Sequence, residues 1–307
     1  MTAAIPSPAK LGAKNLTSDL DLSPDALLHS LELSSQIKRT PARFAQALAG
    51  RYVSLLFEKP SLRTRLTFEL AMKQLGGDVV TCVGPIAERE PVKDVARNLD
   101  RWIHGIVARV FLQTTIDELA HWANVPVINA LSDLYHPCQA LADMLTLKEH
   151  FGRFDRLKLA FVGDGNNVAH SLMLTGARLG VHVAVATPRG YEPNASIVEQ
   201  ASRLGNITIT NDPVEAVADA HAVYTDVWAS MGQESEAAER SRIFMPYQVN
   251  EALLAQARPD AVFMHCLPAK RGQEASDGAI ESPRSVVFDQ AENRLHVQKA
   301  LLVMLLG

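Results

Sequence analysis

Short apolar segments alternate with amphipathic segments through most of the chain, and this alternation constrains the fold more than any other feature. The apolar segments have the length of buried strands, and those between them have the spacing of helices. In the first half, strands are expected at 52–57, 79–82, 103–107 and 125–129, and helices at 63–75, 92–101, 115–122 and 137–151. Strands joined through helices run parallel in one sheet. The sequence therefore predicts an α/β fold with helices on both faces of a parallel sheet.

The alternation begins again after a joint at 152–156 and indicates a second α/β unit. A chain of 307 residues is longer than one core usually spans, so two domains are expected. The second unit should have strands at 158–162, 181–186, 207–210, 222–224 and 261–264, and helices at 168–179, 196–204, 213–218, 236–242 and 248–257. A final helix at 290–306 is so apolar that it should be buried on more than one side. We predict two doubly wound parallel-sheet domains.

Charge and cysteine usage exclude several classes of function. The net charge of −4 gives no support for binding nucleic acid or a membrane surface. The three cysteines form no CxxC pair and show no zinc-ligand spacing, which indicates reduced thiols. Residues 1–14 lack the pattern of a signal peptide, and no apolar run approaches the ~20 residues of a membrane span. We therefore expect a cytoplasmic protein without nucleic-acid or membrane partners.

Polar clusters follow the expected strands, at the positions where a doubly wound sheet binds its ligands. They stand at 61–65, Arg109, 136–139, 163–167, 226–231 and 265–267. Because so many clusters fall at strand ends, we expect an active-site cleft between the two domains.

The cluster at 61–65 combines a helix start with two arginines. Pro60 breaks the chain after a strand, and Ser61 is a plausible N-cap for the following helix. Free amides at a helix N-terminus favour an anion, and the planar guanidinium groups of Arg63 and Arg65 suit phosphate oxygens. The segment is either an anion cradle, for a phosphate, or a capped helix with two solvated arginines.

Three further residues of the first half are candidates for the same site. Arg109 would add another guanidinium, or would form a surface salt bridge. His136 precedes a helix, where the pKa of an imidazole is lowered, so that neutral histidine would donate to a carbonyl oxygen. Gln139 can pair with an amide through its donor and its acceptor. The alternatives are a capping histidine and a surface glutamine.

The clusters of the second half suit an amino acid. The turn at 163–167 lacks the third glycine of a dinucleotide fingerprint, so a nicotinamide oxidoreductase is disfavoured, and its amides suit a carboxylate instead. Asp226 with Ser230 could bind an ammonium group, or Asp226 could form an Asx turn. Cys266 is a reactive thiol or an inert core residue. No His, Asp and Glu set has metal-ligand spacing, so no metal is expected.

Taken together, these strings resemble the aspartate/ornithine carbamoyltransferase family, from about Leu20 to the end and in the expected order. The matching strings are Ser61-Leu62-Arg63-Thr64-Arg65, His136-Pro137-Cys138-Gln139, Gly163-Asp164-Gly165-Asn166-Asn167, Asp226-Val227-Trp228-Ala229-Ser230-Met231-Gly232, His265-Cys266-Leu267-Pro268 and Gln290-Ala291-Glu292-Asn293-Arg294. The strings at 226–232 and 265–268 point to ornithine rather than aspartate as the acceptor.

The resemblance implies a role for each of these groups. Carbamoyl phosphate would be bound by Ser61, Leu62, Arg63, Thr64, Arg109, His136, Pro137, Cys138, Gln139, Cys266, Leu267 and Arg294. Ornithine would be bound by Asn167, Asp226, Ser230 and Met231. The residues implied in catalysis are Arg109, His136 and Cys266, with Cys266 as the proton acceptor.

The implied reaction is transfer of the carbamoyl group of carbamoyl phosphate to the δ-amine of L-ornithine, giving L-citrulline and phosphate in arginine biosynthesis. The resemblance further implies a cytoplasmic homotrimer, or a multiple of trimers, without a metal or organic cofactor. Residues 1–150 would form the carbamoyl-phosphate-binding domain, with helix 290–307 packing back on it, and residues 151–289 the ornithine-binding domain.

One segment departs from the family pattern. Residues 78–93 form a shorter loop than is usual, without the glutamine that reaches a neighbouring subunit's site. Two alternatives follow: a carbamoyltransferase for another amine, such as a modified ornithine or a diamine, and a catalytically weak binding homologue.

Overall fold

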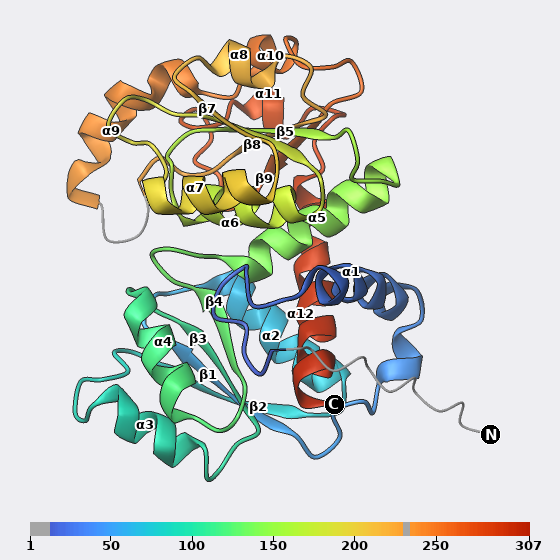
Figure 1. The fold of residues 1–307 in the computed structure, drawn as a ribbon, viewed down its shortest axis with the longest axis vertical. Helices are drawn as coiled ribbons and strands as arrows, with labels where there is room; N and C mark the ends of the chain where they lie inside the picture. Colours follow the sequence, from blue (N-terminus) through green and yellow to red (C-terminus); the bar gives the residue numbers. More distant parts are fainter. Residues whose placement is uncertain (1–12, 230–233) are drawn as a thin grey trace. The chain divides into compact units, whose positions relative to one another are not determined.

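The computed structural model describes residues 13–229 and 234–307, which form two units, each built on its own parallel sheet (Figure 1). Unit 1 comprises the chain up to Leu145 together with Glu292–Gly307, and unit 2 is Thr146–Ala291. Both boundaries fall within a helix, so unit 1 is completed by a segment from the end of the sequence. The predicted fold class, two parallel-sheet α/β domains, is confirmed.

The sheet of unit 1 has four parallel strands in the order β2-β1-β3-β4. Two of them, β3 and β4, begin two residues later than expected. The carboxylate of Asp100 accepts the backbone amides of Asn124, at 2.6 Å, and Val125, at 2.8 Å, which keeps these residues in a turn. The strands are β1 (Tyr52–Phe57), β2 (Asp78–Val83), β3 (Gly105–Arg109) and β4 (Val127–Leu131).

Helices precede and connect these strands. Ser23 begins α1, where its Oγ accepts the amide of Ala26 at 3.1 Å. After α1 only a 3₁₀ turn, η1 (Pro41–Phe44), forms, and the amide of Leu48 donates to the carbonyl of Leu75 at 2.8 Å instead of continuing a helix. The helices that begin in unit 1 are α1 (Pro24–Arg39), α2 (Leu62–Gln74), α3 (Val92–Leu99), α4 (Gln113–Trp122) and α5 (Pro137–Phe151).

The last helix, α12 (Val287–Leu306), is buried on all sides through residues 297–304, as its composition predicts. Leu306 approaches the start of β3 so closely that a Cβ on Gly105 would lie 3.0 Å from it. Near the other end, Lys38 of α1 donates to Oδ1 of Asn293 at 2.8 Å. Within the described ranges, neither α12 nor any other helix is long and apolar enough to cross a membrane.

Unit 2 has five parallel strands in the order β7-β6-β5-β8-β9. The helix expected at 248–257 is wrong in length, because Asn250 caps a new helix by accepting the amide of Leu253 at 3.0 Å. The short helix α11 (Asp277–Ile280) was not expected. The strands are β5 (Lys158–Val162), β6 (His182–Ala186), β7 (Ile207–Thr210), β8 (Ala222–Thr225) and β9 (Val262–His265). The other helices are α6 (Asn167–Arg178), α7 (Ala195–Leu204), α8 (Pro213–Val217), α9 (Ala237–Phe244) and α10 (Glu251–Leu254), with 3₁₀ turns η2 (Glu234–Glu236) and η3 (Met245–Tyr247).

The strand order reverses between β1 and β3 in unit 1 and between β5 and β8 in unit 2. At such a point neighbouring strands lead to helices on opposite faces, which leaves the carboxyl ends of the strands open for a ligand. Arg109 ends β3, and Asp226 follows β8. The topology therefore places predicted site residues of each unit at its switch point.

We expect Asp100→Ala to lower the free energy of unfolding by about 1–3 kcal/mol, because the amides of Asn124 and Val125 lose their acceptor. Asp94→Ala is the matched control, since the partner of Asp94 is Arg97, at 3.7 Å on the surface of α3; such a pair contributes about 0–1 kcal/mol. Urea unfolding measures both variants. Equal losses would contradict the role assigned to Asp100.

Candidate active site

The anion cradle, Ser61–Arg65, forms the turn from β1 into α2. Oγ of Ser61 accepts the amide of Thr64 at 3.3 Å, so the predicted N-cap is confirmed. The first amides of a helix have no acceptor within it, and a helix start of this kind favours an anion. The Leu62 side chain is 65% exposed, so we assign any contact with a ligand to its backbone.

A guanidinium from α12 joins this turn to α5. Arg294 donates from Nη2 to Oγ1 of Thr64 at 2.7 Å and from Nη1 to Oε1 of Gln139 at 2.6 Å. All three residues are buried, and Gln139 is only 1% exposed, so the alternative of a surface glutamine is wrong. Arg109 is also buried, which rules out the surface salt bridge considered for it. The structure thus brings together residues that lie 155 and 230 positions apart in sequence.

The environment of His136 favours a neutral imidazole. Burial, together with the positive charges of Arg294 and Arg109, holds the pKa of His136 well below its usual value. The direction agrees with the sequence-based expectation, but burial is the main cause, whereas we expected the helix terminus to be. A neutral ring at physiological pH can donate one hydrogen bond and accept another.

The neighbouring Cys138 is chemically inert. Its thiol points to β4, where Sγ donates to the carbonyl of Asn129 at 3.5 Å. Burial raises the pKa of Cys138 to about 12, so the thiol stays protonated. Pro137 begins α5, and we assign any ligand contact of Pro137 and Cys138 to the main chain.

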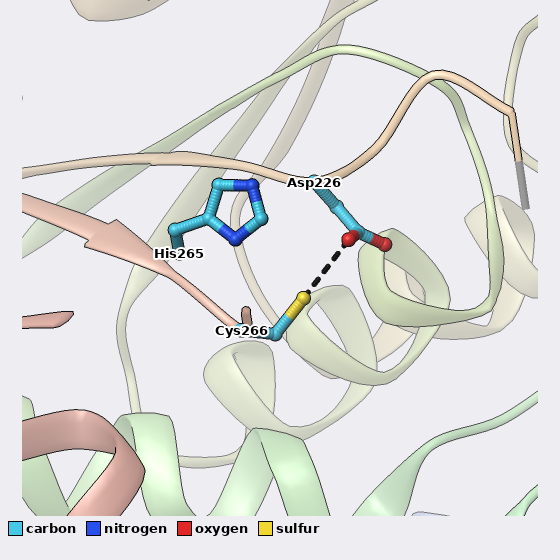
Figure 2. Close-up of side chains that lie close together, drawn as sticks. All are labelled: Asp226, His265 and Cys266. Atoms are coloured by element: carbon cyan, nitrogen blue, oxygen red, sulfur yellow. Dashed lines mark hydrogen bonds between the residues drawn. The ribbon is translucent and has the colours of Figure 1, made fainter. Parts of the chain in front are cut away.

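In unit 2, the ends of β8 and β9 place a carboxylate beside a thiol (Figure 2). Sγ of Cys266 donates to Oδ1 of Asp226 at 2.9 Å. The other carboxylate oxygen of Asp226 accepts Nδ2 of Asn166 at 2.9 Å. Asp226 also accepts the amide of Val227 at 2.8 Å, but its long-range partners show more than a local Asx turn. Cys266 is half-buried, so it is not the inert core cysteine of the alternative reading.

His265 completes a group of three possible metal ligands, since its ring and the Asp226 and Cys266 donor atoms lie within 4.8 Å of one another. The sequence did not predict this grouping, because the three residues come from the ends of two different strands, β8 and β9. Both ring nitrogens already have partners: Nδ1 accepts the amide of Leu267 at 2.8 Å, and Nε2 lies 3.2 Å from Oε1 of Glu274. With Nδ1 accepting, Nε2 carries the proton, so the lone pair that a metal needs is engaged.

The turn after β5 supports Asp226 through Asn166, whereas the sequence pointed to Asn167. Asn166 also caps α6, because its Oδ1 accepts the amides of Val168, at 3.0 Å, and Ala169, at 3.2 Å. The turn packs so tightly that a Cβ on Gly165 would lie 2.2 Å from the backbone nitrogen of Pro193. Only glycine fits there, which is the physical reason for its place in the turn.

A buried ion pair that the sequence did not predict lies beside this turn. Nη1 of Arg240 donates to Oδ2 of Asp164 at 3.0 Å and to the carbonyl of Trp228 at 2.9 Å. Burial raises the pKa of Asp164 to about 6, although Arg240 opposes the shift. Arg240 therefore ties the turn after β5 to the segment after β8, which carries Asp226.

Leu267 lies two residues after β9 and has a left-handed backbone, φ 53°, a conformation that residues other than glycine rarely adopt. Ser230 and Met231 lie outside the described residues.

The chain is similar to known carbamoyltransferases along its whole length. Residues 14–149 match the family model "Aspartate/ornithine carbamoyltransferase, carbamoyl-P binding domain", and residues 155–305 match its "Asp/Orn binding domain". The ornithine carbamoyltransferase of Thermus thermophilus is 52% identical over 306 residues, covering 96% of this chain and 100% of the relative. That of Anoxybacillus flavithermus is 48% identical over 316 residues, covering 100% of this chain and 99% of the relative.

Solved structures give the same result. The ornithine carbamoyltransferase from Pyrococcus furiosus superposes with a TM-score of 0.94 at 46% identity, covering 97% of this chain and 99% of that chain. The enzyme from Gloeobacter violaceus gives a TM-score of 0.88 at 47% identity, covering 96% and 99%.

The raised pKa of Asp164 predicts a specific pH dependence of stability. Between its ordinary value of 3.8 and about 6, the folded state binds the Asp164 proton and the unfolded state does not. The contribution of Asp164 to the free energy of unfolding is therefore complete below pH 3.8 and is lost as the pH rises to about 6.

We expect the unfolding free energy of wild type to fall relative to Asp164→Asn by on the order of 3 kcal/mol across this range, and to run parallel to it above pH ~7. Urea unfolding of both proteins between these pH values measures the difference. A difference that stays constant with pH would contradict the assignment.

Proposed function

Because this chain belongs to the aspartate/ornithine carbamoyltransferase family, we propose that it transfers the carbamoyl group of carbamoyl phosphate to the δ-amine of L-ornithine, giving L-citrulline and phosphate. The observation that carries the proposal is the buried set of donors around Thr64, Gln139 and Arg294, together with the Asp226–Cys266 pair of unit 2.

Unit 1 binds carbamoyl phosphate in this proposal. The phosphate lies at the start of α2, where helix amides, the hydroxyls of Ser61 and Thr64 and the guanidinium of Arg63 surround it. The cationic Arg109 and Arg294 balance its charge, and both also lower the pKa of His136. The neutral His136 then donates to the carbonyl oxygen without adding a further charge.

The arrangement suits the charge that develops during the reaction. As the amine attacks the carbamoyl carbon, negative charge grows on the carbonyl oxygen and on the leaving phosphate. Fixed donors lower the barrier because they need no reorganisation, and loss of one such donor costs about 3 kcal/mol. Arg109 and His136 act on the carbonyl oxygen, and the cradle acts on the phosphate.

Unit 2 binds ornithine and accepts the proton of the attacking amine. Asp226 binds the α-ammonium group, aided by Asn167, Ser230 and Met231. Cys266 already directs its proton at Asp226. As a thiolate, after losing this proton to solvent, Cys266 takes one proton from the δ-amine while the new C–N bond forms and the C–O bond to phosphate breaks. That proton ends on the leaving group, which departs as HPO₄²⁻, so Asp226 stays ionised and the charges balance. Leu267 lines the same loop.

We also propose a cytoplasmic homotrimer that acts in arginine biosynthesis. One face of α2 exposes Leu62, Leu66 and Leu70, at 65%, 42% and 43%, and an apolar stripe of this kind marks a contact surface. Beside it, β2 is an edge strand with Val80 and Val83 exposed. A relative from Pyrococcus furiosus is described as the anabolic enzyme, which supports the biosynthetic direction.

A citrulline assay tests the proposed reaction directly. We expect the purified protein to form citrulline from carbamoyl phosphate and L-ornithine at millimolar concentrations. If the rate were higher with a diamine or a modified ornithine, that amine and not ornithine would be the acceptor. Calorimetric binding of carbamoyl phosphate without citrulline above background would reject the proposal in favour of a binding homologue.

Arg63→Ala should raise the KM for carbamoyl phosphate by about tenfold or more, because a charged hydrogen bond to phosphate contributes about 1.5–3 kcal/mol. Its melting temperature should stay close to that of wild type, since Arg63 is half-buried at the start of α2. Arg43→Ala, an exposed arginine in η1, is the control for loss of charge alone. An unchanged KM with a lowered melting temperature would assign Arg63 a structural role.

Leu66→Glu should lower the native mass, because it places a carboxylate within the exposed stripe of α2. Light scattering after size exclusion measures the mass. Leu204→Glu, which alters an exposed leucine at the end of α7 in unit 2, should leave the mass of wild type unchanged. A trimer that persists in Leu66→Glu would exclude this face from the interface.

A further inference from the structure

The side-chain amide of Gln139 is held between two charged residues, one of which the sequence analysis did not single out. Its Oε1 accepts Nη1 of Arg294 at 2.6 Å, and its Nε2 donates to Oδ1 of Asp143 at 2.8 Å. Asp143 lies one turn further along α5 and is completely buried. Burying a carboxylate costs free energy unless hydrogen bonds or an opposite charge compensate the loss of water.

The chemistry of the two partners fixes which way the amide faces. A guanidinium has donors and no acceptor, so Arg294 can be satisfied only by the oxygen of Gln139. The nitrogen then faces Asp143, which accepts from it. If Asp143 offered no acceptor, the amide could turn, and its NH₂ group would meet the donors of Arg294.

We propose that Asp143 is a positioning residue that keeps the oxygen of Gln139 on the side of Arg294 and Thr64, and so makes the site select carbamoyl phosphate over acetyl phosphate. This inference rests on the proposed function. The two phosphates have nearly the same shape, but the carbamoyl NH₂ donates hydrogen bonds and the acetyl methyl group does not. An amide oxygen has two lone pairs: Arg294 uses one, and the carbamoyl NH₂ uses the other.

The selection follows from the cost of an unmade hydrogen bond. A site built to bond a substrate N–H discriminates strongly against an analogue that lacks it, because a buried acceptor is left unpaired. With the amide turned, the NH₂ of Gln139 would repel the carbamoyl NH₂ and would tolerate a methyl group as well. Asp143 touches neither reacting atom in this account and acts through Gln139.

The test compares the KM for carbamoyl phosphate with the inhibition constant of acetyl phosphate, both from the citrulline assay. We expect Asp143→Leu to narrow the ratio of the two constants by about tenfold or more, mainly through a higher KM, because one buried hydrogen bond contributes about 1–3 kcal/mol. Asp143→Asn keeps an acceptor oxygen and should retain most of the selectivity. The KM for ornithine should stay constant in both.

Two further variants separate positioning from packing. Met144→Ala alters the adjacent buried residue and lowers stability without touching Gln139, so its ratio should match wild type. The double variant Gln139→Met with Asp143→Leu should have the same ratio of constants as Gln139→Met alone, because the amide that Asp143 orients is absent from both.

If Asp143→Leu does not fold, the exchanged pair Gln139→Glu with Asp143→Asn gives the answer. In this pair the side-chain NH₂ at position 143 donates to the carboxylate at position 139, and the other carboxylate oxygen still faces Arg294. The selectivity for carbamoyl phosphate over acetyl phosphate should therefore be retained. The proposal would be overturned if Asp143→Leu kept the selectivity of wild type. It would also be overturned if Met144→Ala, destabilised to the same melting temperature as Asp143→Leu, narrowed the ratio of the two constants equally. An exchanged pair without selectivity would overturn it as well. The citrulline assay of wild type is a separate test. If wild type forms no citrulline, the proposed function is rejected but the orientation of Gln139 is not. That orientation is then tested by calorimetric binding of carbamoyl phosphate and acetyl phosphate to wild type and variants.

Discussion

The buried guanidinium of Arg294 is the interaction on which the site in unit 1 depends. It crosses from α12 to reach α2 through Thr64 and α5 through Gln139. Three helices that are distant in sequence thereby meet around one positive charge, and that charge also depresses the pKa of His136. A cation held this way is ready for an anion before the anion arrives, which is the condition for electrostatic preorganisation. The carboxylate of Asp143 supports the same charge one step further away, through the amide between them.

In unit 2, hydrogen bonds hold a carboxylate in place, as they hold a guanidinium in unit 1. Its central carboxylate, Asp226, is held by Asn166 from the turn after β5 and by Cys266 from the end of β9. Arg240 fixes the same segments from outside, through Asp164 and the carbonyl of Trp228. Parallel strands deliver these residues to one edge of the sheet, and the hydrogen bonds set their orientation. In the proposed reaction, the first sheet provides anion-binding chemistry and the second provides cation-binding chemistry, both at the carboxyl ends of parallel strands.

Local patterns in the sequence predicted most of the fold. β1, β5 and β7 lie where the apolar runs place them, and Ser61 caps α2 as its residue type suggests. The later start of β4 follows a tertiary hydrogen bond, from the amide of Asn124 to Asp100, that no local pattern records. The helix expected at 248–257 is instead interrupted by a local cap, Asn250. The site residues fall into the same two groups. Gln139 was a candidate from its residue type and place in the sequence, and Arg294 was named only through a family resemblance. The roles of Asp143, Asp164 and Arg240 follow from contacts in the folded structure. The i, i+4 spacing of Gln139 and Asp143 was the one available signal, and helices contain many such pairs without function.

The discontinuity of unit 1 has a consequence for biosynthesis. The ribosome makes Thr64 and Gln139 early, but Arg294 is translated only after the whole of unit 2. The nascent first half contains the sequence of its four strands, yet Thr64 at the start of α2 and the glutamine of α5 still lack the guanidinium that joins them. Unit 1 therefore matures last although it begins first, and an interrupted polypeptide would carry the sheet without the charge that makes it receptive.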